Sequence, residues 1–166
     1  MRIGLLSDTH GNFEPTKLGV EALMAAGAEM LIHCGDVGGT DILDLLAGEI
    51  PAYFVFGNND WDRVELANYA LLLGIHCLNA FGEVDFGDGK KAVVLHGDDA
   101  SVMTRLLRAK NHAYLFHGHS HVQRDEQFGD TRIINPGALH RATVKSVALL
   151  DTSSGKLEFI PIASAR

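Results

Sequence analysis

Five short apolar runs, each ending abruptly in polar residues, constrain the fold of this chain more than any other feature. Runs of this length, apolar throughout and rich in Val, Ile, Leu and aromatic residues, are typical of strands buried on both faces. The runs and the clusters that follow them are RIGLL before SDTHGN, MLIHC before GD, AYFVF before GNND, AVVL before HGDD and AYLF before HGHSH. If these strands are parallel, all five clusters lie at one edge of the protein, where open α/β sheets bind their ligands.

The remaining segments predict how the strands are connected. Helix-like stretches with apolar residues near helical spacing cover residues 15–27, 40–48 and 100–110. Gly87-Asp88-Gly89 is a hairpin signal, and from residue 123 strand follows strand. An α/β half followed by a β-rich half predicts an α/β (α+β) protein in which two sheets pack together with helices outside. At 166 residues we expect one domain, residues 1–166.

Composition narrows the class of partner. The formal charge of −7, from 14 basic and 21 acidic side chains, argues against stable binding to nucleic acid. No apolar run approaches the roughly 20 residues of a membrane span, and the N-terminus does not resemble a signal peptide. Cys34 and Cys77 lie in apolar contexts, which favours reduced thiols and a cytoplasmic protein. A homo-oligomer is compatible with the sequence but not required by it.

The polar clusters are rich in Asp, His, Asn and Gly. Carboxylate, amide and imidazole ligands together suit Mn²⁺, Fe²⁺, Ni²⁺ or Zn²⁺. Each motif alone has an ordinary interpretation as a turn or strand end, but five such ends in one chain favour a metal site. In an extended chain His117, His119 and His121 point to the same side, so periodicity alone does not say which of them bind metal.

The order and spacing of the clusters resemble the calcineurin-like metallophosphoesterase superfamily. The motifs that carry the resemblance are Asp8-x-His10, Gly35-Asp36, Gly57-Asn58, His96-Gly97 and Gly118-His119-Ser120-His121. The short length and the later Asn135-Pro136-Gly137 are similar to the small single-domain phosphodiesterase branch. The resemblance implies a four-layer β-sandwich of two mixed sheets flanked by helices, in agreement with the pattern above.

The resemblance also implies a centre of two divalent metal ions, with Mn²⁺ favoured and Fe²⁺, Ni²⁺ and Zn²⁺ as alternatives. One ion would be held by Asp8, His10, Asp36 and His121, and the other by Asp36, Asn58, His96 and His119. The implied reaction is attack of a metal-bridging hydroxide on a small phosphodiester. In this reaction Asp36, Asn58 and His96 are the candidate catalytic residues.

The sequence departs from the family pattern near the expected substrate site. Asn59 stands where many relatives carry His, and because an amide is a poor acid we expect activated esters such as aryl esters to be cleaved best. Asp98 stands where close relatives often have His, and it can orient a ligand or repel substrate. The candidate substrate contacts are Asn12, Asn59, His117 and Arg141, although strand-end packing is the favoured interpretation of His117.

Two alternative functions remain open from the sequence. One is a phosphomonoesterase acting on phosphoproteins or nucleotides. The other is a metal-binding scaffold with little activity, because the same branch contains a retromer scaffold subunit. All seven ligand positions match here, which favours an enzyme. A small chain has little room for a substrate cap, so we expect specificity to depend on short loops such as residues 60–70 and 98–104.

Overall fold

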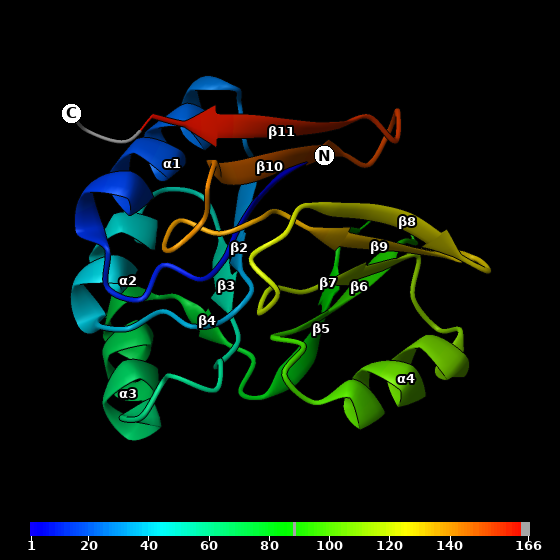
Figure 1. Cartoon of the computed structure of the whole chain (residues 1–166), viewed down its shortest axis with the longest axis horizontal. Helices are drawn as coiled ribbons and strands as arrows, with labels where there is room; N and C mark the ends of the chain where they lie inside the picture. The colour runs from blue at the N-terminus through cyan, green and yellow to red at the C-terminus, as the bar shows by residue number, and fades with distance from the viewer. Residues whose placement is uncertain (88, 164–166) are drawn as a thin grey trace.

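Two β-sheets pack face to face, with helices covering their outer faces, in the computed structural model (Figure 1). The structure describes residues 1–87 and 89–163. The first sheet has the strand order β11-β10-β1-β2-β3-β4, and the second has the order β5-β6-β7-β9-β8. The strands of the first sheet are β1 (Arg2–Leu6), β2 (Met30–His33), β3 (Ala52–Phe54), β4 (His76–Cys77), β10 (Lys145–Asp151) and β11 (Leu157–Ile162). Those of the second are β5 (Phe81–Asp85), β6 (Lys91–Leu95), β7 (Tyr114–Phe116), β8 (Arg124–Phe128) and β9 (Thr131–Asn135).

Both sheets are mixed. Strands β1, β2, β3 and β4 are parallel, and β10 and β11 add to their edge in antiparallel pairs. In the second sheet β6, β7 and β9 are parallel, with β5 and β8 as antiparallel edges. The carboxyl ends of the parallel strands therefore meet at one edge of each sheet. This architecture confirms the predicted two-sheet α/β fold.

Four helices form the outer layers of the described chain. They are α1 (Phe13–Ala25), α2 (Thr40–Leu46), α3 (Arg63–Leu73) and α4 (Ala100–Ala109). Figure 1 shows α1, α2 and α3 stacked along one side of the molecule and α4 alone on the other. Within the described residues, no helix has the length and hydrophobicity needed to span a membrane.

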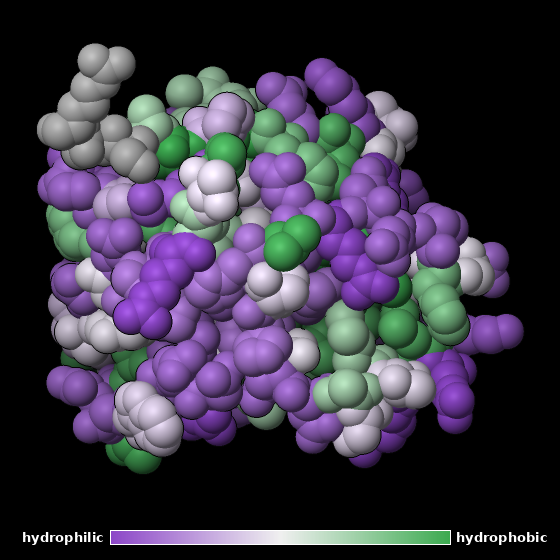
Figure 2. Space-filling view, viewed as in Figure 1, coloured by the Kyte–Doolittle hydropathy of each residue, from purple (hydrophilic) through white to green (hydrophobic). Residues whose placement is uncertain are grey.

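Three apolar layers hold these elements together. The middle layer fills the space between the sheets with side chains such as Leu5, Phe116 and Ile134, all fully buried. A second layer lies between the first sheet and α1–α3, and a third, smaller one lies under α4. Figure 2 shows that the middle and left of the visible face are largely hydrophilic, whereas hydrophobic residues gather between α4 and the second sheet. Burial on both faces explains why the strands read as uninterrupted apolar runs.

Most elements lie where the sequence predicts them, but the two segments expected to be short loops do not. Residues 100–104 of the expected loop 98–104 are the first turns of α4, in line with the helix predicted over residues 100–110. The predicted helices correspond to α1, α2 and α4, and β5 pairs antiparallel with β6 as the hairpin signal indicates. Residue 88 of that signal lies outside the described residues. Residues 60–70, expected to be a loop, instead contain most of α3. The prediction was wrong because α3 has apolar residues on its solvent face, which hides the helical period.

Candidate metal centre

The polar clusters after five strands converge where the carboxyl ends of the two sheets meet. Backbone hydrogen bonds join the first two loops: the N–H of Asp8 donates to the carbonyl of Gly35 (3.0 Å), and that of His10 donates to the carbonyl of Asp36 (2.9 Å). The second sheet contributes in the same way, because the N–H of Gly118 donates to the carbonyl of His96 (2.9 Å). The loops after β1 and β2, and those after β6 and β7, are thereby held against each other before any side chain is considered.

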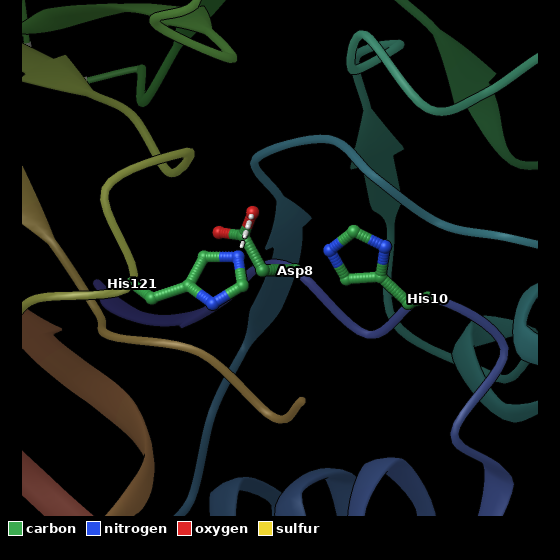
Figure 3. Close-up of side chains that lie close together, drawn as sticks. All are labelled: Asp8, His10 and His121. Carbon is green, nitrogen blue, oxygen red and sulfur yellow. Dashed lines mark ion pairs between the residues drawn. The ribbon is translucent and has the colours of Figure 1, made fainter. Parts of the chain in front are cut away.

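Asp8, His10 and His121 form the first group of side chains that can share a metal ion, with ligand atoms all within 4.8 Å of one another. Figure 3 shows Asp8 and His121 pointing toward each other and the ring of His10 approaching from the opposite side. The dashed contact joins His121 Nε2 to Asp8 Oδ1 at 3.2 Å. Two loops from different sheets therefore contribute to one cluster.

Asp8, Asp36 and His96 form the second group, and all three are buried. The Oδ2 atom of Asp36 lies 3.3 Å from His96 Nε2 and 3.4 Å from His10 Nε2. This oxygen therefore lies between a histidine of the first group and one of the second. Asp8 also connects the groups, since its Oδ1 lies 3.9 Å from His96 Nε2.

Asn58 and His119 lie at the exposed side of the second group. Asn58 Oδ1 is 3.1 Å from His119 Nδ1, and the backbone N–H of His119 donates to Asp8 Oδ2 at 3.0 Å. The ring of His119 meets that of His96 edge to face, with centroids 5.1 Å apart. The structure thus brings all seven sequence-predicted ligand residues into one cluster.

The donor atoms of this cluster fit a divalent metal. Among the described residues, Asp8 Oδ1, His10 Nε2 and His96 Nε2 are buried without a hydrogen-bond partner, although buried polar atoms are normally paired. His96 Nδ1 lies 2.9 Å from the carbonyl oxygen of Cys34, which can only accept. That bond keeps the proton on Nδ1 and leaves the lone pair of Nε2 free for a metal.

The electrostatics of the cluster depend on burial. Burial raises the pKa of Asp8 above its ordinary value, against the opposing effect of a hydrogen bond from Ser7. Burial also acts on Asp36, but the nearby His96 and the hydrogen bonds from Asn59 outweigh it and hold the pKa of that carboxyl well below its usual range. Burial opposes protonation of His96, yet Asp36 and the Cys34 carbonyl raise its pKa. The crowded carboxylates therefore favour a cation between them.

The backbone of the cluster is unusual. Five of the seven residues have φ between 48° and 65°, a region that side-chain-bearing residues rarely adopt: Asp8, His10, Asp36, His119 and His121. Such conformations cost of order 1–3 kcal/mol each and are found mainly at functional sites. The left-handed residues turn the chain sharply after each strand, which is what directs the side chains to a common point.

Several supporting residues were missed by the sequence analysis. Ser7 Oγ donates to Asp8 Oδ2 (2.7 Å), and Asp60 accepts from the N–H of Gly57 and of Gly38 (2.7 and 2.9 Å). Asn135 Nδ2 donates to the carbonyl of Gly118 (2.8 Å). All of these side chains are adjacent to, or within, the motifs that carry the resemblance. Their position was therefore a usable signal, but Gly38, the second partner of Asp60, and Gly118, the partner of Asn135, lie far away in the sequence.

His33 is a further supporting residue, buried completely behind the cluster. Its Nδ1 accepts from the N–H of Gly35 (3.2 Å), so its Nε2 carries the proton and donates to Thr9 Oγ1 (2.9 Å). The Thr9 hydroxyl in turn donates to the carbonyl of Val37 (2.8 Å). One neutral imidazole thus links the loop that carries Asp8 to the loop that carries Asp36.

The candidate substrate contacts lie at different distances from the cluster. Asn59 is at its edge, donating to both carboxylate oxygens of Asp36 through its backbone N–H and its Nδ2 (2.8 Å each). His117 is buried beside Arg124, with Nε2 3.5 Å from the guanidinium. Asn12 donates from Nδ2 to the carbonyl of Leu139 (3.1 Å), and Arg141 is exposed. The structure brings only Asn59 into direct contact with a predicted ligand.

Comparison with known proteins agrees with this geometry. The chain is 28% identical over 159 residues to phosphodiesterase MJ0936 of Methanocaldococcus jannaschii, covering 92% of this chain and 93% of that protein. A solved archaeal phosphodiesterase superposes with a TM-score of 0.89 at 25% identity, covering 98% of this chain and all of that one. The Zn²⁺ complex of Vps29 from Entamoeba histolytica shares the fold, with a TM-score of 0.63 at 19% identity over 98% of each chain.

The family itself is identified by a sequence match over most of the chain. Residues 1–155 match the calcineurin-like phosphoesterase superfamily domain. This match confirms the resemblance inferred from the five motifs and the prediction of a phosphoric ester hydrolase. This match agrees with the two-sheet architecture and with the convergence of the candidate metal ligands. The chain belongs to the calcineurin-like phosphoesterase superfamily.

Proposed function

We propose that this protein is a metal-dependent phosphodiesterase with a centre for two divalent ions. The observation that carries the proposal is the convergence of buried, unpartnered ligand atoms from Asp8, His10 and His96 at the strand ends. The family and its phosphodiesterase relative support the same reaction. The residues that would hold the ions are Asp8, His10, Asp36, Asn58, His96, His119 and His121.

The chain's own residues determine how such a centre works. Asp36 lies between His10 and His96, so we infer that it is the ligand shared by both ions. Bound divalent ions supply positive charge for phosphoryl oxygens and lower the pKa of water to near neutrality. Asn59 fixes the Asp36 carboxylate, and its amide is too weak an acid to protonate a departing oxygen. We therefore expect good leaving groups, such as phenolates, to be released fastest.

Several properties of the enzyme follow as part of the proposal. We favour Mn²⁺, with Fe²⁺, Ni²⁺ and Zn²⁺ as alternatives, because the ligand set mixes carboxylate, amide and imidazole. The free thiols of Cys34 and Cys77 support a reducing, cytoplasmic location. The net charge of −7 supports a small phosphate ester rather than a nucleic acid as substrate. Residues 1–166 would act as one domain, alone or as a homo-oligomer.

The test compares hydrolysis of bis(4-nitrophenyl) phosphate with that of 4-nitrophenyl phosphate by Mn²⁺-loaded and chelated protein. Asp36→Asn removes the charge of the shared ligand. Asp130→Asn makes the same chemical change at an exposed position in the turn between β8 and β9 and serves as the matched control. We expect metal-dependent cleavage of the diester that Asp36→Asn reduces at least 100-fold, the size of effect that removing one catalytic interaction has in other enzymes.

The other outcomes discriminate between the alternatives. Faster cleavage of the monoester would replace the proposal with a phosphomonoesterase. Turnover of neither ester, with two ions bound according to elemental analysis, would indicate a metal-binding scaffold. Equal activity of Asp36→Asn and Asp130→Asn would show that the reaction occurs elsewhere.

A further inference from the structure

A hollow opens directly beside His96, between the loop after β3 and the start of α4. Its volume is about 210 Å³. The walls are mainly apolar and include Phe56, Phe81, Leu95 and Val102. The candidate metal ligand His96 is among the lining residues, so a group bound in the hollow lies next to the candidate centre.

The size and walls of the hollow suit one aromatic ring. A cavity of about 150 Å³ lined by apolar side chains binds benzene, so this volume accommodates a substituted ring. Phe81 is 39% exposed although it is a large aromatic residue, and its free surface is part of the lining. A flat ring that covers Phe81 removes apolar area from water, and aromatic pairs add about 0.5–1.5 kcal/mol.

The walls are fixed before any ligand arrives. The guanidinium of Arg63 lies over the ring of Phe56, 5.4 Å from its centroid. The same guanidinium donates to the carbonyls of Asp60 (3.2 Å) and Gly57 (3.1 Å). Arg105 lies over Phe81 in a similar manner, at 5.8 Å. Side chains held in this way lose little freedom on binding, which favours affinity for a ring of matching shape.

The charges at the rim decide which part of a diester fits. Asp98 and Asp99 line the hollow and outnumber its one cationic lining residue, Arg63, whose guanidinium is engaged with backbone carbonyls. Asp99 is held in place as the N-cap of α4, accepting from the N–H of Ser101 and Val102. A departing ester oxygen gains negative charge, which these carboxylates repel. A second phosphate is repelled for the same reason. The rim therefore favours an uncharged ring on the ester arm that stays attached to phosphorus.

We propose that this hollow binds an aromatic ring on the retained ester arm of the substrate, and we call it the retained-arm pocket. The substrate class is then a phosphodiester that carries an uncharged aromatic or heteroaromatic group, and Phe81 is a specificity-determining residue. This inference rests on the proposed phosphodiesterase function.

The test uses two substrates with the same leaving group. Bis(4-nitrophenyl) phosphate retains an aromatic arm, whereas methyl 4-nitrophenyl phosphate retains a methyl group. We expect Phe81→Ala to lower the ratio of the two kcat/KM values about tenfold, because only the first substrate places a ring in the pocket. Val102→Trp fills the pocket without removing a wall and should lower the same ratio.

Phe128→Ala is the matched control. Phe128 is 54% exposed and lies on β8, the edge strand of the second sheet opposite to β5, which carries Phe81. Its substitution removes an exposed aromatic residue outside the pocket and should leave the ratio as in the wild type. Thermal unfolding of all three variants checks that they remain folded.

A binding measurement keeps the inference separate from the reaction. Phenylphosphonate added to the Zn²⁺-loaded protein should show nuclear Overhauser contacts between its ring protons and the methyl groups of Val102. Turnover of both substrates with an unchanged ratio in Phe81→Ala and Val102→Trp would overturn the pocket assignment alone. Turnover of neither substrate by the wild type would overturn the proposed function. In that case the presence or absence of the Val102 contacts would still support or refute the pocket.

Discussion

The free energy of unfolding should depend on pH through His33, the neutral imidazole that links two loops of the metal centre. Its Nδ1 accepts from Gly35 and its Nε2 donates to Thr9, so the ring has no free lone pair for a second proton. Burial lowers the pKa of His33 from 6.5 to about 3. Protonation in the folded state would place a charge in a completely buried position.

The sign and size of the effect follow from the gap between the ordinary pKa of histidine, 6.5, and the value of about 3 in the folded chain. Between pH 6.5 and about 3 the unfolded chain binds a proton at His33 that the folded chain does not, so stability rises with pH across this range. The contribution is present above pH 6.5 and is lost as the pH falls. One pH unit corresponds to 1.36 kcal/mol. At pH 5 the loss relative to pH 7.5 is therefore about 2 kcal/mol.

Urea denaturation of the chelated protein at pH 7.5 and pH 5 measures this effect without metal release. His33→Gln should be less stable than the wild type at pH 7.5, and the difference should shrink by about 2 kcal/mol at pH 5, because glutamine does not titrate. His76→Gln is the matched control, since His76 is an exposed histidine in the same sheet, and its difference from the wild type should stay constant. A constant difference for His33→Gln as well would refute the assignment of a buried, neutral His33.

Two further predictions concern the metal centre and its loops. Removal of metal should lower the free energy of unfolding by about 2.7 kcal/mol for each site saturated at 100 times its Kd, because bound ions offset the crowding of buried Asp8 and Asp36. Calorimetry with and without EDTA tests this, and identical unfolding temperatures would contradict it. Gly38→Ala should destabilise the protein more than Gly74→Ala and weaken Mn²⁺ binding in calorimetric titration. Both glycines have positive φ, but of the two only Gly38 would place its new Cβ against backbone atoms, 2.3 Å from the Gly11 nitrogen. Equal effects of the two substitutions would show that this close approach is unimportant.

The strands could be predicted because burial on both faces leaves a direct mark on the sequence. The helix α3 could not be predicted from periodicity, since its solvent-facing side carries apolar residues. Val64, Leu71 and Leu72 are 73%, 78% and 82% exposed. A local signal was nevertheless present. Asp62 caps the helix by accepting from the N–H of Glu65 (3.0 Å), and an acidic residue three positions after an Asp is a known helix-start pattern.

The convergence of the candidate ligands was predictable, but the way in which the fold brings them together was not. Five strand ends with ligand-type residues indicate a site because parallel strands bring their carboxyl ends to one edge. The sequence does not specify how the two sheets are placed against each other. That placement brings His96 of the second sheet to within 3.3 Å of Asp36 of the first. Contacts of this kind depend on the packing of the whole core between the sheets, and no single motif determines that packing.

The three histidines after β7 show why alternation alone was insufficient. An extended chain would place His117, His119 and His121 on the same side, but β7 ends at Phe116. Beyond it, φ is 65° at His119 and 58° at His121, so the chain turns and the period of two no longer applies. His117 remains buried against Arg124, whereas His119 and His121 reach Asn58 and Asp8. Which of the three rings reach the candidate ligands is therefore set by where the strand ends. Residues other than glycine that adopt left-handed backbone conformations leave little trace in a single sequence.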